Sequence, residues 1–149
     1  MRTDRPTWRN FLHHLRVHEG FRSQAYQCSE GYLTIGYGRK IEGDKGLSQE
    51  EAEFLLSNDA REASDQLLKN VNLPDNITIA QRMALTAMVF QLGIGTFKKF
   101  KKMIAAVERG EWAKAADEAL DSRWAIQTPR RAQEVAEILR TGFMEVERE

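Results

Sequence analysis

The chain has 149 residues, of which 42% are hydrophobic and 30% are charged, and its 22 basic residues balance its 22 acidic ones. This composition indicates a globular domain with a real core, and the balanced charge gives no argument for binding nucleic acid or an anionic surface. The opening segment carries Arg2, Asp4, Arg5 and Arg9 and lacks the apolar core of a secretory signal, so we expect no signal peptide. No apolar run approaches the roughly 20 residues that a membrane-spanning helix needs, and we expect no membrane insertion.

The N-terminal part of the chain predicts one helix followed by a small sheet. Apolar residues at helical spacing predict a helix over residues 7–18, which Thr7 can cap and which breaks at Gly20. Residues 25–38 mix aromatic and β-branched residues with glycines, a texture typical of short strands joined by tight turns. Glu19 is therefore expected at a helix end, opposite this sheet.

The rest of the chain is predicted to be helical. A capping-box pattern from Ser48 to Glu51 opens a long amphipathic helix over residues 48–72, long enough to connect two lobes. Thr128 and Pro129 are a favourable cap and first-turn pair for the last helix. Four further helices are expected over residues 78–91, 97–108, 111–120 and 129–140. The predicted fold class is α+β, mostly α, with a small antiparallel sheet near the N-terminus.

The position of Glu19 suits one kind of chemistry. A carboxylate at a helix end, beside a glycine and opposite an aromatic-rich sheet, is placed to lose solvent and therefore to keep its proton. Glycoside cleavage needs such an acid to protonate the departing oxygen, together with a second group that acts on the opposite face of the sugar. Most glutamates near helix ends are solvated surface groups, so position alone favours a surface role.

The wider pattern around Glu19 is more specific. The stretch from Glu19 to Tyr26 and the stretch Glu-Gly-Tyr-Leu-Thr-Ile-Gly-Tyr-Gly over residues 30–38 closely resemble the opening of T-even phage lysozymes and related endolysins. The motif of that family is Glu, eight residues, Asp, five residues, Thr, and Glu19, Cys28 and Thr34 occupy those spacings. The resemblance implies that Glu19 is the general acid and that Thr34 holds the attacking water. Cys28 replaces the aspartate.

Two later blocks, over residues 88–93 and 122–132, also resemble this family. The resemblance implies a single domain over residues 1–149 with a two-lobed lysozyme-like fold. It divides the chain into a small β lobe over residues 19–47, an interlobe helix over 48–72, and a helical lobe over 73–149 that is joined by helix 7–18.

Two charged contacts follow from the resemblance. Arg131 is expected to reach Glu19 as an orienting partner, which would hold the acid in position. Arg39 is expected to pair with Asp59 on the long helix, in a structural role.

Cys28 leaves three roles open. It can orient water as a thiolate or polar group, which we favour, it can act as a nucleophile, or it can be buried filler without chemistry. A nucleophile would need about 5 Å between the two groups and an inverting pair roughly 6.5 to 9.5 Å, and the family resemblance implies inversion. Glu30 is a less favoured substitute base.

A cysteine–histidine hydrolase is disfavoured because His13, His14 and His18 share one helix and lack an orienting third residue. The single cysteine and three histidines show no zinc-ligand spacing, so we expect no metal and no cofactor.

Four residues are candidates for substrate binding: Tyr26, Phe90, Gln91 and Thr128. Aromatic rings stack on the apolar faces of sugars, and an amide can read hydroxyl or acetamido groups. Core packing is an equal interpretation for Phe90, which lies in a helical apolar run. Gln91, just beyond it, is the better contact candidate.

The resemblance implies an N-acetylmuramidase that hydrolyses the β-1,4 bond between N-acetylmuramic acid and N-acetylglucosamine in bacterial peptidoglycan. We expect a monomer that waits in the host cytoplasm until a holin releases it, or that is carried in the phage particle. Two alternatives remain. One is a lytic transglycosylase that forms 1,6-anhydromuramyl ends, and the other is a virion-associated wall-binding module with little turnover.

Overall fold

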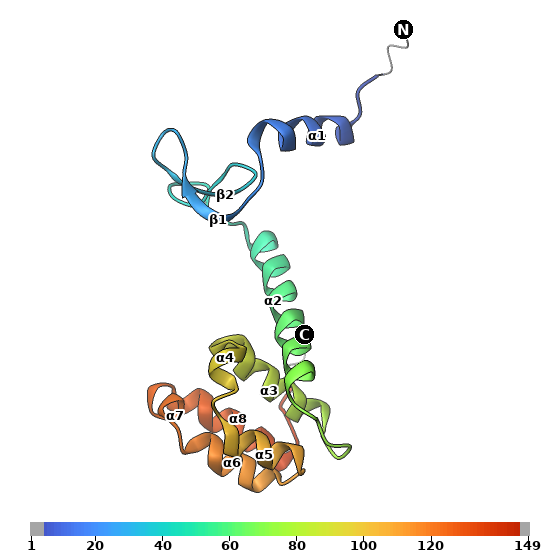
Figure 1. Ribbon diagram of the computed structural model, residues 1–149, viewed down its shortest axis with the longest axis vertical. Helices are drawn as coiled ribbons and strands as arrows, with labels where there is room; N and C mark the ends of the chain where they lie inside the picture. Colours follow the sequence, from blue (N-terminus) through green and yellow to red (C-terminus); the bar gives the residue numbers. More distant parts are fainter. Residues whose placement is uncertain (1–4, 147–149) are drawn as a thin grey trace. The chain divides into compact units, whose positions relative to one another are not determined.

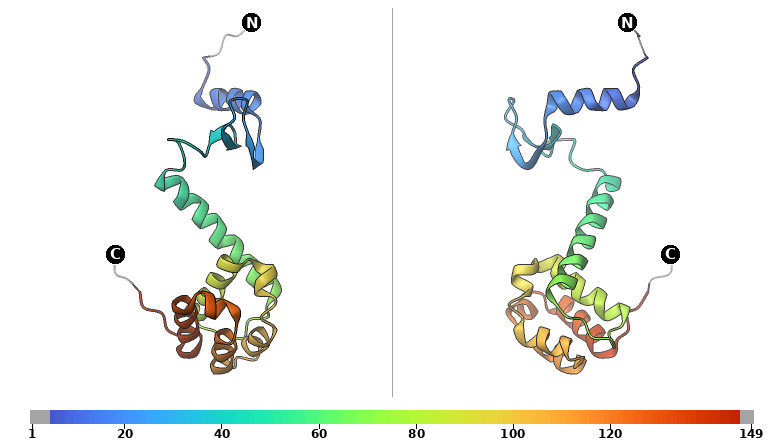
Figure 2. Two further views of the ribbon diagram at one scale, coloured as in Figure 1. Left: turned by 90° about the vertical axis from the view of Figure 1, so that its left-hand side faces the viewer. Right: turned by 45° about the vertical axis from the view of Figure 1, so that its right-hand side comes forward.

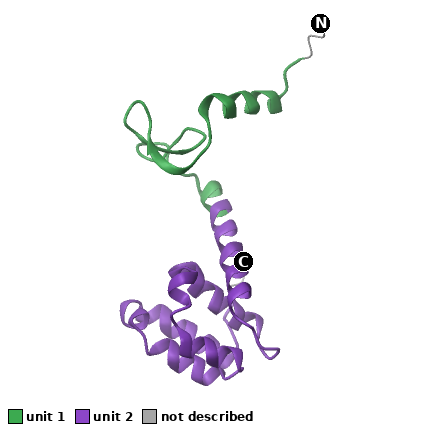
Figure 3. Ribbon diagram, in the orientation of Figure 1, with its two compact units in different colours: residues 1–53 green, residues 54–149 purple. Residues whose placement is uncertain are grey.

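A computed structural model describes residues 5–146. The chain forms two compact units, which divide between Glu53 and Phe54 (Figure 3). Helix α2, Gln49–Asn70, begins in the first unit and continues in the second. The fold is mostly helical with one small antiparallel sheet near the N-terminus, which confirms the predicted fold class.

The first unit opens with helix α1, Trp8–Glu19 (Figure 1). A capping box starts it, because the Asn10 backbone N–H donates to the Thr7 hydroxyl at 3.2 Å while the Thr7 N–H donates to the Asn10 side chain at 2.8 Å. The helix ends at Gly20, which has φ +70° and donates its N–H to the Arg16 carbonyl. Both ends of this predicted helix are confirmed to within a residue.

Three strands follow: β1 Arg22–Gln27, β2 Leu33–Gly36 and β3 Arg39–Lys40. They form one antiparallel sheet in the order β1-β2-β3. Thr34 on the central strand pairs with Tyr26 on β1 and with Lys40 on β3. Strand β3 extends beyond the predicted region, because the turn at Tyr37 and Gly38 returns the chain along β2.

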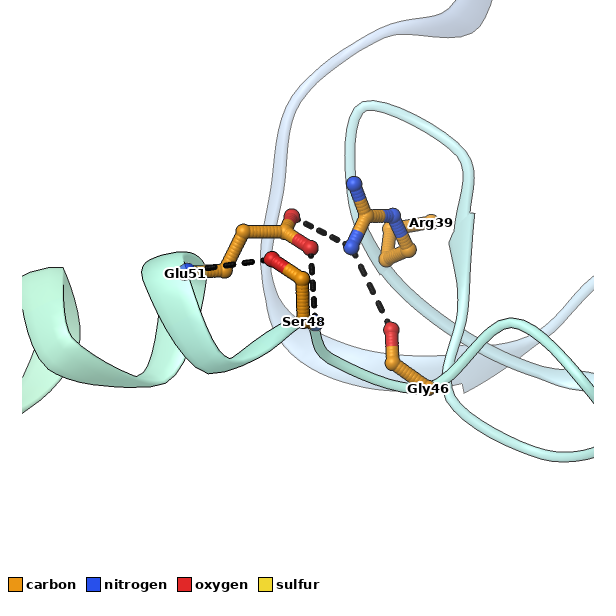
Figure 4. Close-up of polar contacts among 4 residues, drawn as sticks. All are labelled: Arg39, Gly46, Ser48 and Glu51. Atoms are coloured by element: carbon orange, nitrogen blue, oxygen red, sulfur yellow. Dashed lines mark hydrogen bonds and ion pairs between the residues drawn. The ribbon is translucent and has the colours of Figure 1, made fainter.

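The start of α2 is fixed by the predicted capping box. The Glu51 N–H donates to the Ser48 hydroxyl at 3.1 Å, and the Ser48 N–H donates to the Glu51 carboxylate at 3.0 Å (Figure 4). Arg39 forms an ion pair with Glu51 and donates to the Gly46 carbonyl at 3.2 Å, whereas its expected pairing with Asp59, a residue of the second unit, stays a prediction. The capping box thus presents the Glu51 carboxylate to Arg39 of β3.

The second unit contains the rest of α2 and six further helices among its described residues (Figures 1 and 2). The predicted helix over residues 97–108 is wrong at its start, since Lys98 to Phe100 leave the helical path before α5. The single-turn helices α4 and α7 were not expected. The six helices are α3 Ile79–Leu92, α4 Ile94–Phe97, α5 Lys101–Glu108, α6 Trp112–Leu120, α7 Arg123–Gln127 and α8 Pro129–Thr141.

The core of the second unit lies where α6 packs against α5 and α8, and α8 packs against α3. Three fully buried alanines on α6, Ala115, Ala116 and Ala119, let its neighbours approach closely. Leu67, Leu85, Met88, Phe97, Met103 and Leu139 fill the space between the helices. Among the described residues, no helix combines the length and the apolar composition that crossing a membrane requires.

A buried glutamine joins two of these helices. Gln81 is 3% exposed, and its amide donates to the Leu139 carbonyl at 2.8 Å while its side-chain oxygen accepts the Thr78 N–H at 2.9 Å. The Thr78 hydroxyl donates in turn to the Gly142 carbonyl at 2.9 Å. The first turn of α3 is therefore tied to the last turn of α8 by satisfied polar groups.

Candidate active site

Glu19 is the last residue of α1, and its side chain rests on the backbone of the turn between β2 and β3. A Cβ atom built on Gly38 would lie only 2.7 Å from Glu19 Oε2 and 3.3 Å from Glu19 Cδ. The carboxylate therefore occupies the space that a side chain at position 38 would fill. The rest of the Glu19 side chain is exposed, so within the first unit the expected loss of solvent is limited to this contact.

Cys28 lies in the turn between β1 and β2 and is half-buried. Its N–H donates to the Tyr32 carbonyl at 2.9 Å, and the Gly31 N–H donates to the Cys28 carbonyl at 2.8 Å. Gly31 has φ +84°, a conformation that glycine adopts without steric cost. These bonds fix the backbone of Cys28 next to the start of β2.

The surroundings of Cys28 lower the pKa of its thiol below the ordinary 9.0. The largest cause is the backbone N–H of Tyr32, followed by that of Glu30, since both stabilise the thiolate by hydrogen bonding. Desolvation opposes these two bonds, while the Thr34 hydroxyl and the positive charge of Lys40 lower the pKa by smaller amounts. The thiolate is therefore easier to form here than in a free cysteine.

Lys40 brings a positive charge to this corner of the sheet. Its ammonium forms an ion pair with Glu30 at 3.1 Å and lies 4.6 Å from the centre of the Tyr32 ring. The hydrogen bond to Glu30 is the main reason that the pKa of Lys40 is raised above 10.5. Lys40 thus stays charged throughout the neutral range.

Thr34 is 2% exposed, and its hydroxyl donates to the Tyr32 carbonyl at 2.9 Å. Residues directly opposite one another on neighbouring strands project from the same face of a sheet, so the pairing places Tyr26, Thr34 and Lys40 in one row. Cys28 and Tyr32 join this face, because each lies two residues from a member of the row. The first unit thus brings together three of the predicted site residues, Tyr26, Cys28 and Thr34.

Gln91 and Thr128, both in the second unit, meet at Trp124. The Gln91 side-chain oxygen accepts the indole N–H of Trp124 at 3.0 Å, and the Thr128 hydroxyl donates to the Trp124 carbonyl at 2.9 Å. Thr128 is the N-cap residue of α8 and Pro129 occupies its first turn, as predicted, but the Thr128 side chain makes no capping hydrogen bond. Gln91 keeps its amide N–H groups for another partner.

Phe90 and Arg131 line a mainly apolar groove of the second unit, between α2, α3 and α8. Both side chains are exposed. Arg131 belongs to the second unit and Glu19 to the first, and their pairing stays a prediction.

Three residues of this arrangement were missed as functional candidates. The sequence predicts Gly38 only as one of the turn glycines over residues 25–38, although a glycine between two short strands signals a close approach of another group. Lys40 is detectable only through its cross-strand pairing with Thr34. Trp124 lies in the stretch 122–132 that resembles the family, but its hydrogen bond to Gln91 joins residues 33 apart in sequence.

In chemical terms, the first unit offers a carboxylic acid on a fixed backbone seat and a thiol whose ionised form is stabilised. A buried hydroxyl lies beside the thiol. Hydrolysis of an acetal needs a proton donor and a second group that can become anionic, and a carboxyl group and such a thiol are of the right chemical kinds.

Comparison with known proteins agrees with this chemistry. Residues 16–139 match the phage lysozyme family. The probable T4-type lysozyme 2 of Dictyostelium discoideum is 31% identical, over 87% of this chain and 93% of that protein. The pre-baseplate central spike protein of Enterobacteria phage T4 is 32% identical, over 88% of this chain and 28% of its own length. An endolysin of Bacillus phage B103 is 32% identical, over 71% of this chain and 41% of its own length. The chain therefore belongs to the phage lysozyme family and is a glycosidase of the lysozyme type, a class of peptidoglycan hydrolase.

Proposed function

We propose that this lysozyme hydrolyses the β-1,4 bond between N-acetylmuramic acid and N-acetylglucosamine, with Glu19 as the general acid. The observation that carries the proposal is the seat of the Glu19 carboxylate on Gly38, in the same compact unit as Cys28 and Thr34. A proton donor needs a fixed position relative to the leaving oxygen. The backbone of the β2–β3 turn supplies that position.

We propose an inverting reaction, as the resemblance to the family implies. Thr34 and Gly38 are four residues apart, so even a fully extended chain between them spans only about 13 Å. The Glu19 carboxylate lies at one end of this span, and the Cys28 thiol faces Thr34 at the other. An inverting pair needs roughly 6.5 to 9.5 Å between its two groups, and this short span is compatible with that separation.

In the proposed step, one proton leaves Glu19 and one proton arrives at Cys28. Glu19 gives its proton to the glycosidic oxygen as the bond to the anomeric carbon breaks. Water held by the Thr34 hydroxyl forms the new bond from the opposite face, and its proton passes to the Cys28 thiolate. Glu19 ends as a carboxylate and Cys28 as a thiol, and exchange with solvent restores both.

We propose that bound glycan removes water from the Glu19 carboxylate. Its side chain is exposed in the first unit, so a sugar lying over the carboxylate would remove water from it and favour the protonated form. We propose that Tyr26 contacts the glycan from the first unit, and that Phe90, Gln91 and Thr128 contact it from the second.

The same proposal covers the domain organisation. The two units would be the lobes of one lysozyme domain over residues 1–149, with α2 as the interlobe helix and helix 7–18 joining the helical lobe. Arg131 would then reach Glu19 and orient it. We propose that the enzyme acts as a monomer on bacterial peptidoglycan and degrades the host wall. It would be delivered either as an endolysin or in a phage particle, the two settings named for relatives of this chain.

The test is digestion of purified peptidoglycan by the wild type, Glu19→Gln and the matched surface variant Glu53→Gln. We expect Glu19→Gln to lose lysis while keeping the wild-type melting temperature, and Glu53→Gln to be unaffected. Product masses and the anomeric configuration of the new ends are recorded. Hydrated ends with inverted configuration support the proposal. Anhydro ends would instead identify a transglycosylase, and equal murein binding without turnover by all three proteins would identify a wall-binding module.

A further inference from the structure

We propose that Gly38 is a positioning residue for Glu19: its lack of a side chain creates the seat in which the acid is held. This inference rests on the proposed role of Glu19 as the proton donor. Gly38 has no side chain that could reach substrate, so it acts on the reaction through Glu19.

The distances show how little room the seat leaves. A Cβ atom at position 38 would lie 2.7 Å from Glu19 Oε2, 3.3 Å from Cδ and 3.7 Å from Cγ, whereas ordinary contacts begin at 3.4 Å. Any larger residue must therefore push the carboxylate oxygen away by about 0.7 Å or more. Because Glu19 has a flexible side chain and Gly38 belongs to a hairpin turn, the carboxylate rather than the backbone is expected to move.

The backbone conformation at position 38 is a second reason for glycine there, independent of the contact with Glu19. Gly38 has φ +75°, a left-handed conformation that strains any residue with a Cβ atom. Gly36 provides the control, since it has φ +69° but a Cβ atom there would meet nothing within 4 Å. Alanine at position 36 thus introduces the same kind of strain into the same hairpin without touching Glu19.

The chemical consequence is a fall in turnover. A proton donor displaced by about 1 Å from its productive position can lose on the order of a hundredfold in rate. Substrate binding involves many other groups, so KM should change little. We expect Gly38→Ala to lower kcat by roughly tenfold to a hundredfold relative to Gly36→Ala.

The experiment compares wild type, Gly36→Ala and Gly38→Ala by urea unfolding and by steady-state hydrolysis of peptidoglycan. Similar losses of stability in the two variants, with a fall in kcat confined to Gly38→Ala, support the inference. Equal kcat values in the two variants would overturn it. If Gly38→Ala does not fold, Gly38→Asn replaces it, because asparagine tolerates the left-handed region and still carries a Cβ atom.

Two further measurements connect the effect to Glu19. The side-chain carboxyl 13C resonance of Glu19 should move in Gly38→Ala and stay in place in Gly36→Ala, a readout that needs no activity. In a Glu19→Gln background, Gly38→Ala should cause no further loss of the residual turnover, because the group it displaces no longer donates a proton. If both Gly38→Ala and Gly36→Ala leave the resonance unchanged, the seat does not exist. If Glu19→Gln retains full activity while the resonance does move, the proposed function fails and the contact stands.

Discussion

Arg39 and Glu51 connect the last strand of the sheet to the first turn of α2 through an ion pair (Figure 4). The same carboxylate accepts the Ser48 N–H and completes the capping box of the helix. Glu51 therefore has to be ionised for the sheet and the helix to be joined in this way. Acid should loosen the junction between β3 and α2.

The first prediction concerns this acid sensitivity. The Ser48 N–H, the Ser48 hydroxyl and Arg39, in that order, hold the pKa of Glu51 below its ordinary 4.5. A carboxylate with a lowered pKa in the folded state contributes stability above its unfolded pKa, and the contribution disappears as the pH falls through the folded value. We expect Glu51→Gln to melt at a lower temperature than wild type at pH 7, and the difference to shrink as the pH falls below 4.5 and Glu51 takes up its proton.

The control for this prediction is Glu50→Gln. Glu50 also lies in the first turn of α2, so both variants lose a favourable interaction with the helix dipole. Only Glu51 closes the capping box and pairs with Arg39. Equal melting temperatures of Glu50→Gln and Glu51→Gln at pH 7 would contradict the prediction.

The second prediction concerns the thiol of Cys28. Its pKa lies below 9.0, so alkylation by iodoacetamide should reach half its maximal rate at a lower pH than for free cysteine. Lys40→Gln removes a charge that stabilises the thiolate, and the profile should move to higher pH. It should not reach the free-cysteine profile, because the N–H groups of Tyr32 and Glu30 remain.

Lys45→Gln serves as the matched control, since Lys45 is an exposed lysine of the same unit. Its alkylation profile should coincide with that of the wild type. The double variant Lys40→Gln/Glu30→Gln tests whether the shift comes from the lost cation or from a released Glu30 carboxylate. Coincident profiles for wild type and Lys40→Gln would show that the lysine does not act on the thiol.

Much of this fold could be predicted because its signals are local. The capping boxes at Thr7 and Ser48 and the break at Gly20 each depend on residues within one helical turn, and each was found where expected. The predicted helix over 97–108 is too long at its start. Phe97 is a buried core residue that ends α4, and the chain changes direction at Phe100 before α5 begins. Helical spacing alone cannot detect such a change of direction.

The candidate site residues come from a signal of the same local kind. Motif spacing identified Glu19, Cys28 and Thr34, because these residues stand at fixed offsets along the chain. The partner of Arg39 and the seat of Glu19 on Gly38 depend on how a turn meets a helix end, which spacing does not encode. Contacts of this kind need the folded backbone.

The third prediction concerns the buried glutamine of the second unit. Gln81→Leu would leave the Leu139 carbonyl and the Thr78 N–H without their present partners. Unsatisfied buried groups cost about 1–3 kcal/mol each, so we expect a loss of roughly 3 kcal/mol in the free energy of unfolding, measured in urea. Gln133→Leu, at an exposed position of α8, should change it by less than about 0.5 kcal/mol. A similar small change in Gln81→Leu would show that the network is dispensable.

The last prediction distinguishes the three roles of Cys28 by replacing it with aspartate and with serine. Aspartate ionises near pH 4, so Cys28→Asp should extend hydrolysis to more acidic pH, where the thiol has taken up its proton. Serine cannot form an anion near neutral pH, and loss of a general base typically costs about a hundredfold to ten-thousandfold in rate, so Cys28→Ser should fall by a factor in that range. If both variants keep the wild-type rate and pH profile, Cys28 is filler. If the wild type releases products with retained configuration and Cys28→Ser is inactive, the thiol is a nucleophile. Retention then results from two inversions at the anomeric carbon, with a covalent intermediate between them.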